Sequence, residues 1–182
     1  ALTPQDAIDE VGKLKNVSVL IAQCEIPQEV TLAAFRTAQD LGITTILNPA
    51  PYQPLTDDLL ELTDWLIPNE TEFRELHGSL PSNDQILKSF RPGKNSIVTL
   101  GSEGAVYISP QGELHRVSAP KVTAVDTTGA GDSFVGSFAF SLASGKDPVA
   151  AMSFGIKVAS LSVTRKGAQS SYPDQAEIAT LS

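Results

Sequence analysis

The sequence predicts an α/β fold in which a parallel sheet carries helices on both faces. Short apolar runs rich in β-branched residues alternate with segments of helical apolar spacing as far as residue 101. A hairpin pattern and two long apolar helices follow. Because parallel strands need crossovers, and helical crossovers return on either face of the sheet, this order indicates a Rossmann-like three-layer arrangement. We expect one domain over residues 1–182.

Capping signals and apolar spacing place the elements of the alternating part. Thr3 followed by Pro4 begins a helix that extends to about Leu14, since a side-chain cap and a first-turn proline favour a helix start. Gly42 and Gly78 are natural helix ends. The remaining predictions alternate between the two types: strand 17–22, helix 28–42, strand 43–47, helix 56–62, strand 64–68, helix 70–78, helix 84–90 and strand 96–101.

The rest of the chain has a different rhythm. Two short strands separated by Pro-Gln-Gly indicate an antiparallel hairpin at 104–118. Long apolar segments then predict helices at 129–144 and 148–164, and a shorter helix is expected at 174–182. We expect this second half to complete the same domain.

The composition excludes several classes of protein. The chain of 182 residues is 41% hydrophobic and 19% charged, with a formal net charge of −8. Its basic residues are scattered, so we expect no nucleic-acid partner. No apolar run approaches the roughly 20 residues that cross a bilayer, so we expect no membrane partner. The single cysteine, Cys24, and two histidines argue against a disulfide or a structural zinc site. These features predict a cytoplasmic protein.

Polar segments follow the ends of the predicted strands. In open parallel sheets, ligands bind beyond the carboxyl ends of the strands. The segments at those positions are glycine-rich, polar and acidic, namely 23–27, 48–51, 69–72, 101–104 and 126–132. We expect the functional residues among them.

The stretch DTTGAGDS, residues 126–133, joins two glycines to the start of a helix. Glycine turns and a helix start both leave backbone N–H groups available, which favours binding of an anion such as a phosphate. Asp132 lies beside those groups and can accept a proton from an attacking hydroxyl. The alternative is a plain turn in which Asp132 only complements the helix dipole. From the spacing alone both interpretations stay open.

Two further segments have a structural and a functional interpretation. In PNETE, residues 68–72, Asn69 caps a helix, and Glu72 either supports that cap or holds Mg²⁺ through water. TLGSEG, residues 99–104, either makes a simple turn or receives a nucleotide through its exposed backbone and the Thr99 and Ser102 hydroxyls. Glu25 follows the first strand and, taken alone, reads as an exposed charge.

Five motifs together carry a family resemblance. The string VDTTGAGDSFVGSFAFSLA, residues 125–143, resembles the second sequence pattern of the ribokinase (PfkB) family of carbohydrate kinases. The order and spacing of the other motifs are also similar to that family: LNPAP at 47–51, PNETE at 68–72, TLGSEG at 99–104 and RKGAQSSYP at 165–173. The resemblance covers essentially the whole chain and implies a ribokinase-like fold.

The resemblance implies ATP-dependent phosphorylation of D-ribose at its 5-hydroxyl. Asp132 is then the catalytic base and also a sugar contact, and Glu25 is a second sugar contact. The anion hole consists of the amides of Gly129, Ala130 and Gly131. The residues implied to bind the nucleotide are Asn69, Thr99, Leu100, Gly101, Ser102, Glu103, Gly104, Gly131 and Asp132.

The resemblance also implies two metal ions. Glu72 would organise Mg²⁺ through water. A monovalent cation, K⁺, would activate the enzyme; its ligands would be the Asp126 carboxylate, the Ser171 hydroxyl and the carbonyl groups of Thr128, Ser162, Arg165 and Gly167. The partners implied are a small-molecule sugar and a nucleotide.

The first third of the family pattern has no counterpart here. That part supplies the lid and half of the sugar contacts, so we expect the chain alone to bind nucleotide weakly and to turn over little sugar. We expect a homodimer only for the full-length protein, and the sheet edge next to the missing strands should be open. Two alternatives remain: a kinase of the same family for fructose, a ketodeoxy sugar acid or a nucleoside, and a non-catalytic nucleotide-fold binding module.

Overall fold

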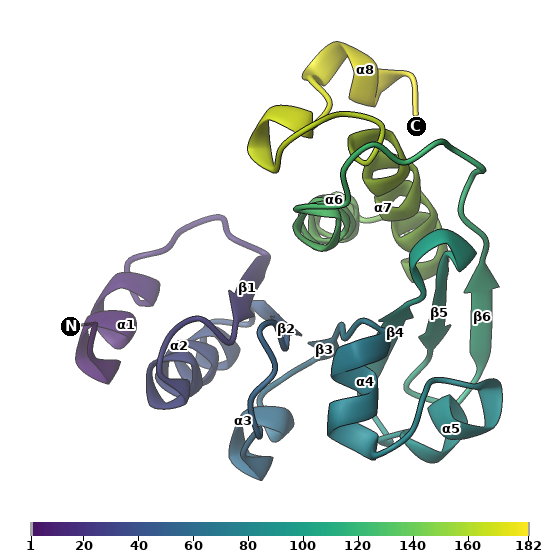
Figure 1. Cartoon of the computed structure of the whole chain (residues 1–182). Helices are drawn as coiled ribbons and strands as arrows, with labels where there is room; N and C mark the ends of the chain where they lie inside the picture. The colour runs from purple at the N-terminus through teal and green to yellow at the C-terminus, as the bar shows by residue number, and fades with distance from the viewer. Residues whose placement is uncertain (1, 182) are drawn as a thin grey trace. The chain divides into compact units, whose positions relative to one another are not determined.

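A computed structural model of the chain describes residues 2–181 and confirms the α/β class (Figure 1). Six strands form one sheet in the order β1-β2-β3-β4-β5-β6. The strands are β1 Val19–Gln23, β2 Thr44–Asn48, β3 Trp65–Leu66, β4 Asn95–Thr99, β5 Ala105–Ile108 and β6 Leu114–Val117. The strand order follows the chain order, as short sequential connections favour.

Eight α-helices and two 3₁₀ turns are present in the described residues. The helices are α1 Pro4–Val11, α2 Gln28–Asp40, α3 Asp57–Glu61, α4 Glu70–His77, α5 Asn83–Lys88, α6 Ala130–Ala143, α7 Pro148–Ser162 and α8 Gln175–Ala179. The 3₁₀ turns are η1 Gly101–Glu103 and η2 Gln169–Ser171. Every predicted element is present, with bounds that differ from the predicted ones by at most three residues; the predicted end of the last helix at residue 182 lies outside the described residues.

The chain divides into two compact units. The first comprises the chain up to Ile97 together with Ile108–Glu113, and the second comprises Val98–Tyr107 and the chain from Leu114 onward. The single domain expected from the sequence stays a prediction.

In the first unit, the strands are parallel, and their register aligns two polar residues. β1 pairs with β2 from Val19↔Thr44 to Gln23↔Asn48. β3 then pairs with both β2 and β4, through Ile46↔Trp65 and Trp65↔Asn95. Because parallel strands point the same way, Gln23 and Asn48 end their strands side by side.

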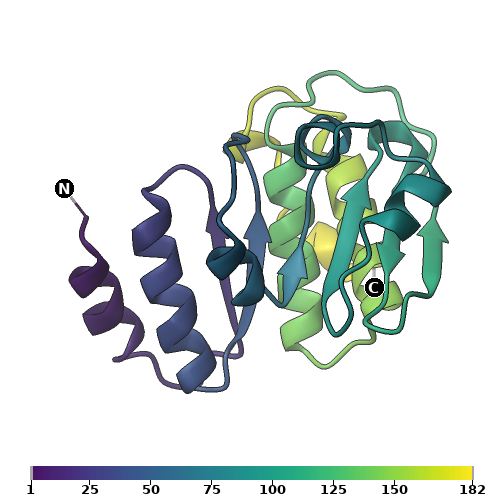
Figure 2. The same cartoon turned by 90° about the horizontal axis from the view of Figure 1, so that it is seen from below.

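Helix α2 covers this part of the sheet, with α1 packed beside it (Figure 2). Phe35 of α2, Leu47 of β2 and Leu59 of α3 are buried together, with exposed fractions of at most 1%. Burial of each such side chain contributes about 1.5–3 kcal/mol to folding. The apolar spacing of α2 therefore anchors the helix over the strands that carry Gln23 and Asn48.

In the second unit, helices α6 and α7 pack closely against each other. Phe134 and Phe138 of α6 stack with ring centroids 6.2 Å apart. Gly155 of α7 permits the close approach, because a Cβ atom there would lie 3.0 Å from the Phe134 ring. This packing fixes the position of α6, whose first turn carries Asp132.

Candidate functional site

A chain of side-chain amides connects the ends of β1 and β2 with the start of α4 in the first unit. Gln23 Nε2 donates to Asn48 Oδ1 at 2.8 Å. Asn48 Nδ2 in turn donates to the Ile67 carbonyl at 2.8 Å and faces Glu72 Oε2 at 3.5 Å. Asn48 and Glu72 are 8% and 6% exposed. The strand ends therefore carry a buried polar network, as the polar segments in the sequence predict.

Asn69 and Glu72 form a reciprocal capping box at the start of α4. The Glu72 amide donates to Asn69 Oδ1 at 2.9 Å, and the Asn69 amide donates to Glu72 Oε2 at 2.9 Å. Asn69 Nδ2 also donates to Glu72 Oε1, at 2.8 Å. Burial raises the pKa of the Glu72 carboxyl, and the bonds from Asn69 oppose that shift. The predicted cap at Asn69 is confirmed, and both Glu72 oxygens already accept hydrogen bonds.

Glu25 lies in the exposed turn that follows β1, as its position in the sequence suggests. The turn is held by backbone and side-chain bonds to Cys24: its amide donates to the Ala50 carbonyl at 2.9 Å, and its carbonyl accepts Gln53 Nε2 at 3.0 Å. The Glu25 carboxylate therefore projects from an anchored turn at the carboxyl end of β1.

In the second unit, Asp126 holds the glycine-rich loop to the segment after α7. Its Oδ1 accepts the Thr128 amide at 2.9 Å, and its Oδ2 accepts the Gly167 amide at 2.9 Å. These two bonds, assisted by the charge of Lys166, lower the pKa of the Asp126 carboxyl to about 2. The two aspartates of the motif thus differ in position. Asp126 accepts backbone amides of two segments, whereas Asp132 lies in the first turn of α6.

The turn into α6 depends on Gly129. Its φ of +77° favours glycine, and a Cβ atom there would lie 3.0 Å from the Tyr172 hydroxyl and 3.3 Å from Ala168. The Gly129 carbonyl accepts the Ser133 amide at 2.9 Å and the Tyr172 hydroxyl at 3.3 Å. The Gly129 peptide is therefore held both by the first turn of α6 and by Tyr172.

The three amides assigned to an anion hole differ in their surroundings. The Ala130 amide already donates to the Thr127 carbonyl at 3.2 Å. Gly131 is exposed, and no atom beyond its chain neighbours and its own helix backbone lies within 4 Å of the position that a Cβ atom would take. Gly131 is therefore the most exposed of the three residues and has open space where a side chain would lie, and the shared role of the three amides stays a prediction.

Asp132 lies exposed in the first turn of α6. Its negative charge adds to burial in raising the pKa of the Tyr172 phenol, burial being the larger cause. An exposed carboxylate in the first turn of a helix can take a proton from a hydroxyl group bound beside it.

The oxygen atoms assigned to K⁺ come from the segments around Asp126, Ser162 and Ser171. The Val163 carbonyl accepts the amides of Val125 and Asp126 at 2.7 and 3.2 Å, and the Ser162 carbonyl accepts the Arg165 amide at 3.1 Å. The Ser171 hydroxyl is buried and donates to the Ala168 carbonyl at 2.6 Å. The six groups assigned to K⁺ all belong to this unit and are all oxygen donors, which suits a hard monovalent cation.

Helix α8 is attached to the same segment by an ion pair. The Arg165 guanidinium binds both carboxylate oxygens of Glu177, with Nη1 3.0 Å from Oε2. Glu177 also closes a capping box with Asp174 at the start of α8. The pair raises the pKa of Arg165 and lowers that of Glu177.

The 99–104 loop closes on itself as a 3₁₀ turn. The Leu100 amide donates to the Gly104 carbonyl at 2.8 Å, and the Gly104 amide donates to the Gly101 carbonyl at 3.1 Å. Gly104 has a φ of +98°, and a Cβ atom there would lie 2.0 Å from the Val117 carbonyl oxygen. Gly101, Ser102 and Glu103 are exposed on this turn, so the loop presents a backbone surface whose shape Gly104 sets.

Sequence reasoning missed three residues of these networks. Asn48 lies in one of the polar segments after a strand, so its position was a usable signal. Tyr172 lies in the RKGAQSSYP motif, but its contact with Gly129, 43 residues away, is not visible in the sequence, and neither is that of Glu177 with Arg165, 12 residues away.

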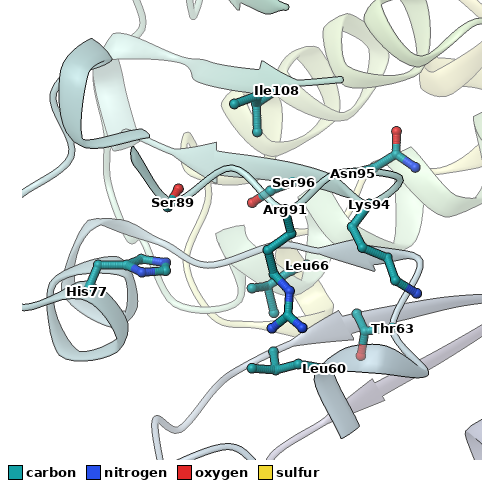
Figure 3. A pocket seen from close by; sticks show the side chains of 10 residues that line it. All are labelled: Leu60, Thr63, Leu66, His77, Ser89, Arg91, Lys94, Asn95, Ser96 and Ile108. Atoms are coloured by element: carbon teal, nitrogen blue, oxygen red, sulfur yellow. The ribbon is translucent and has the colours of Figure 1, made fainter. Parts of the chain in front are cut away.

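A separate small cavity lies in the first unit (Figure 3). His77, Arg91 and Lys94 line it together with apolar side chains. Its volume is about 30 Å³, room for roughly one or two water molecules. Arg91 is paired with Glu61, and Lys94 donates to the Glu61 carbonyl. The Arg91 and Lys94 side chains at this cavity are therefore already engaged.

None of the helices within residues 2–181 has the length and apolar character needed to span a bilayer.

Comparison with known proteins places these residues in a family context. The model of the pfkB family carbohydrate kinases matches residues 1–175. Ribokinase of Staphylococcus aureus is 39% identical over 179 residues, covering 94% of this chain and 59% of its own length. Deoxyribokinase of Salmonella typhimurium is 38% identical over 179 residues, covering 94% and 58%.

The solved structures agree. The structure of Arabidopsis thaliana ribokinase complexed with ribose and ATP is similar with a TM-score of 0.87 and 30% identity, covering 97% of this chain and 58% of that one. The chain thus spans less than two thirds of the length of the relatives it matches. Since the family model matches nearly the whole chain, including the Asp126–Asp132 loop, the chain belongs to the pfkB family of carbohydrate kinases.

Proposed function

We propose that this chain carries the catalytic-base and nucleotide side of an ATP-dependent kinase that phosphorylates D-ribose at its 5-hydroxyl. The observation that carries the proposal is the division of labour in the 126–132 loop. Asp126 is engaged by the Thr128 and Gly167 amides, while Asp132 is exposed at the start of α6. Ribokinases of 39% and 30% identity support ribose and ATP as the substrates.

The reaction needs a base and an anion site. In our proposal Asp132 removes the proton from the ribose 5-hydroxyl while that oxygen attacks the γ-phosphorus of ATP. The bond from the γ-phosphorus to the β-phosphate oxygen breaks, and ADP leaves. The amides at Gly129, Ala130 and Gly131 and the α6 dipole stabilise the charge on the transferred group, with Gly131 as the most open member. Glu25 orients the sugar.

Nucleotide binding falls to Asn69 and the 99–104 loop in this proposal. The capping box holds Asn69 in one orientation, and Gly104 keeps the loop backbone in one shape. The residues concerned are Asn69, Thr99, Leu100, Gly101, Ser102, Glu103 and Gly104. Rigid placement of such contacts lowers the ordering cost of binding.

The residues proposed to hold metals fit that role to different degrees. Mg²⁺ would neutralise charge on the ATP phosphates. Because both Glu72 oxygens accept hydrogen bonds from Asn69, a contact from Glu72 through water fits better than direct coordination. The oxygen donors of Asp126, Thr128, Ser162, Arg165, Gly167 and Ser171 fit K⁺, which would neutralise Asp126 and stiffen the neighbouring loop.

The decisive experiment compares two proteins in a coupled assay for ribose-dependent ADP production. The 182-residue chain alone should turn over little ribose, whereas a protein completed with the N-terminal part of the Staphylococcus aureus relative should be active. Asp132→Asn in the completed protein should reduce kcat by a factor of about 10²–10⁴, as expected for loss of a general base, with ATP affinity retained.

Asp147→Asn is the matched control, since Asp147 caps the neighbouring helix α7 and asparagine caps equally well. Full activity of the Asp132→Asn protein would exclude Asp132 as the base. Full ribose-dependent turnover by the 182-residue chain would refute its proposed dependence on further residues. ATP binding without any turnover in the completed protein would favour the binding-module alternative.

A second acceptor is favoured by one finding. A deoxyribokinase is 38% identical to this chain, close to the 39% of the ribokinase. 2-Deoxyribose has the same 5-hydroxyl group, so Asp132 would act identically on it. Comparing kcat/KM for ribose and 2-deoxyribose in the completed protein decides between them, with fructose as a further acceptor; a preference for deoxyribose would overturn the ribose proposal.

A further inference from the structure

Tyr172, which directly follows η2 in the second unit, contacts the glycine-rich loop. Its hydroxyl donates to the Gly129 carbonyl at 3.3 Å, across 43 residues of sequence. That same carbonyl accepts the Ser133 amide at 2.9 Å, which is the first hydrogen bond into α6. The tyrosine therefore holds the peptide at which the loop becomes a helix.

The backbone on either side of Tyr172 is held in place by hydrogen bonds and burial. The Tyr172 amide donates to the Gln169 carbonyl at 3.3 Å, and the preceding Ser171 is 1% exposed with its hydroxyl bonded to Ala168. Pro173 on the other side is buried as well. Because its backbone is held in this way, the Tyr172 side chain can restrain the neighbouring loop instead of moving with it.

Close packing accompanies the hydrogen bond. The position of a Gly129 Cβ atom would lie 3.0 Å from the Tyr172 hydroxyl and 3.3 Å from both Ala168 carbon atoms. Gly129, Ala168 and Tyr172 thus meet without spare room. Gly131, two residues further along, is exposed with open space beside it.

We propose that Tyr172 is a positioning residue, whose hydroxyl holds the Gly129 peptide and thereby fixes the first-turn backbone of α6, including the exposed Gly131, in the orientation that a bound phosphate group needs. This inference rests on the proposed function and adds a residue that acts through Gly129. Tyr172 itself touches no reacting atom. Its effect is to keep the donor direction fixed before the anion arrives, which reduces the ordering needed on binding.

The test uses Tyr172→Phe, which removes the hydroxyl and keeps the ring. Calorimetric titration of the 182-residue chain with ATP, with ADP and with adenosine, the nucleotides with Mg²⁺ present, separates the terminal phosphate from the rest of the ligand. We expect affinity for ATP to fall about fivefold, roughly the worth of one hydrogen bond, with adenosine binding unchanged. Tyr52→Phe, in the first unit, is the matched control.

Hydrogen exchange of the backbone provides a readout that needs no ligand. Tyr172→Phe should speed exchange in peptides covering 129–133 several-fold and leave those of α7 unchanged. An equal loss of affinity for all three ligands would indicate a general structural effect and overturn the proposal, as would unchanged ATP affinity. If the parent binds no nucleotide, the proposed function of this chain fails; the exchange result then decides the positioning role, and unchanged exchange refutes it.

Discussion

The Asp126 carboxylate accepts the amide of Gly167, 41 residues further along the chain, at 2.9 Å. The same carboxylate accepts the Thr128 amide, so one side chain joins the glycine-rich loop to the segment after α7. The loop and its support are therefore one structural unit, and changes in either should affect both.

Asp126 should make stability depend on pH in an acidic window. The pKa of the Asp126 carboxyl, about 2, lies below the ordinary 3.8. Its contribution to the free energy of unfolding is therefore fully present above pH 3.8 and is lost as the pH falls through the pKa of the folded state, about 2. Urea unfolding of the parent and Asp126→Asn should therefore differ most at neutral pH and converge as pH decreases below 4. Asp40→Asn, at the end of α2, is the control; a constant difference across pH would contradict the prediction.

Asn48 should be the most sensitive member of the buried amide network. Asn48→Ala removes the acceptor of one Gln23 hydrogen bond and the side-chain donor to the carbonyl of buried Ile67, and a buried polar group left without a partner costs about 1–3 kcal/mol in unfolding free energy. Gln23→Ala, at a less buried position, should cost less. Equal losses measured by chemical denaturation would argue against a network centred on Asn48.

Asn48→Asp should reveal the charge of Glu72. The new carboxylate would face Glu72, whose pKa burial already raises, and two like charges at this distance repel. The variant should be more destabilised at pH 7 than at pH 5, where protonation relieves the repulsion. Asn48→Ala serves as the reference, since its effect should not follow this trend.

Gly104 should tolerate no side chain. Gly104→Ala would place Cβ 2.0 Å from the Val117 carbonyl oxygen at a φ of +98°, so the backbone must shift, and we expect a loss above about 3 kcal/mol. Gly101→Ala also has positive φ but open space, and should cost about 1–2 kcal/mol. Thermal unfolding of both variants checks the contrast; similar melting temperatures would contradict it.

Phe35 should contribute strongly to the unfolding free energy through the core under α2. Phe35→Ala should lower the unfolding free energy by about 3–5 kcal/mol, because it empties a site that is 0% exposed. Phe140→Ala, at a position 65% exposed, should change it by less than about 0.5 kcal/mol. Denaturation midpoints of the two variants provide the measurement.

The sequence by itself determined the types and order of the elements. The caps at Thr3, Thr56 and Asn69 and the apolar spacing of α2 act over a few residues, so their signals survive without the fold. The predicted strand at 64–68 is longer than β3, which pairs over only two residues, because pairing depends on neighbouring strands.

Only the tertiary structure decided which polar groups meet. The contacts Asn48–Glu72, Asp126–Gly167 and Tyr172–Gly129 join residues 24, 41 and 43 positions apart. Such contacts arise from packing of whole elements, which no local pattern encodes. For that reason the sequence indicated an acidic, glycine-rich motif, but only the fold showed that Asp126 supports the loop while Asp132 remains exposed at the start of α6.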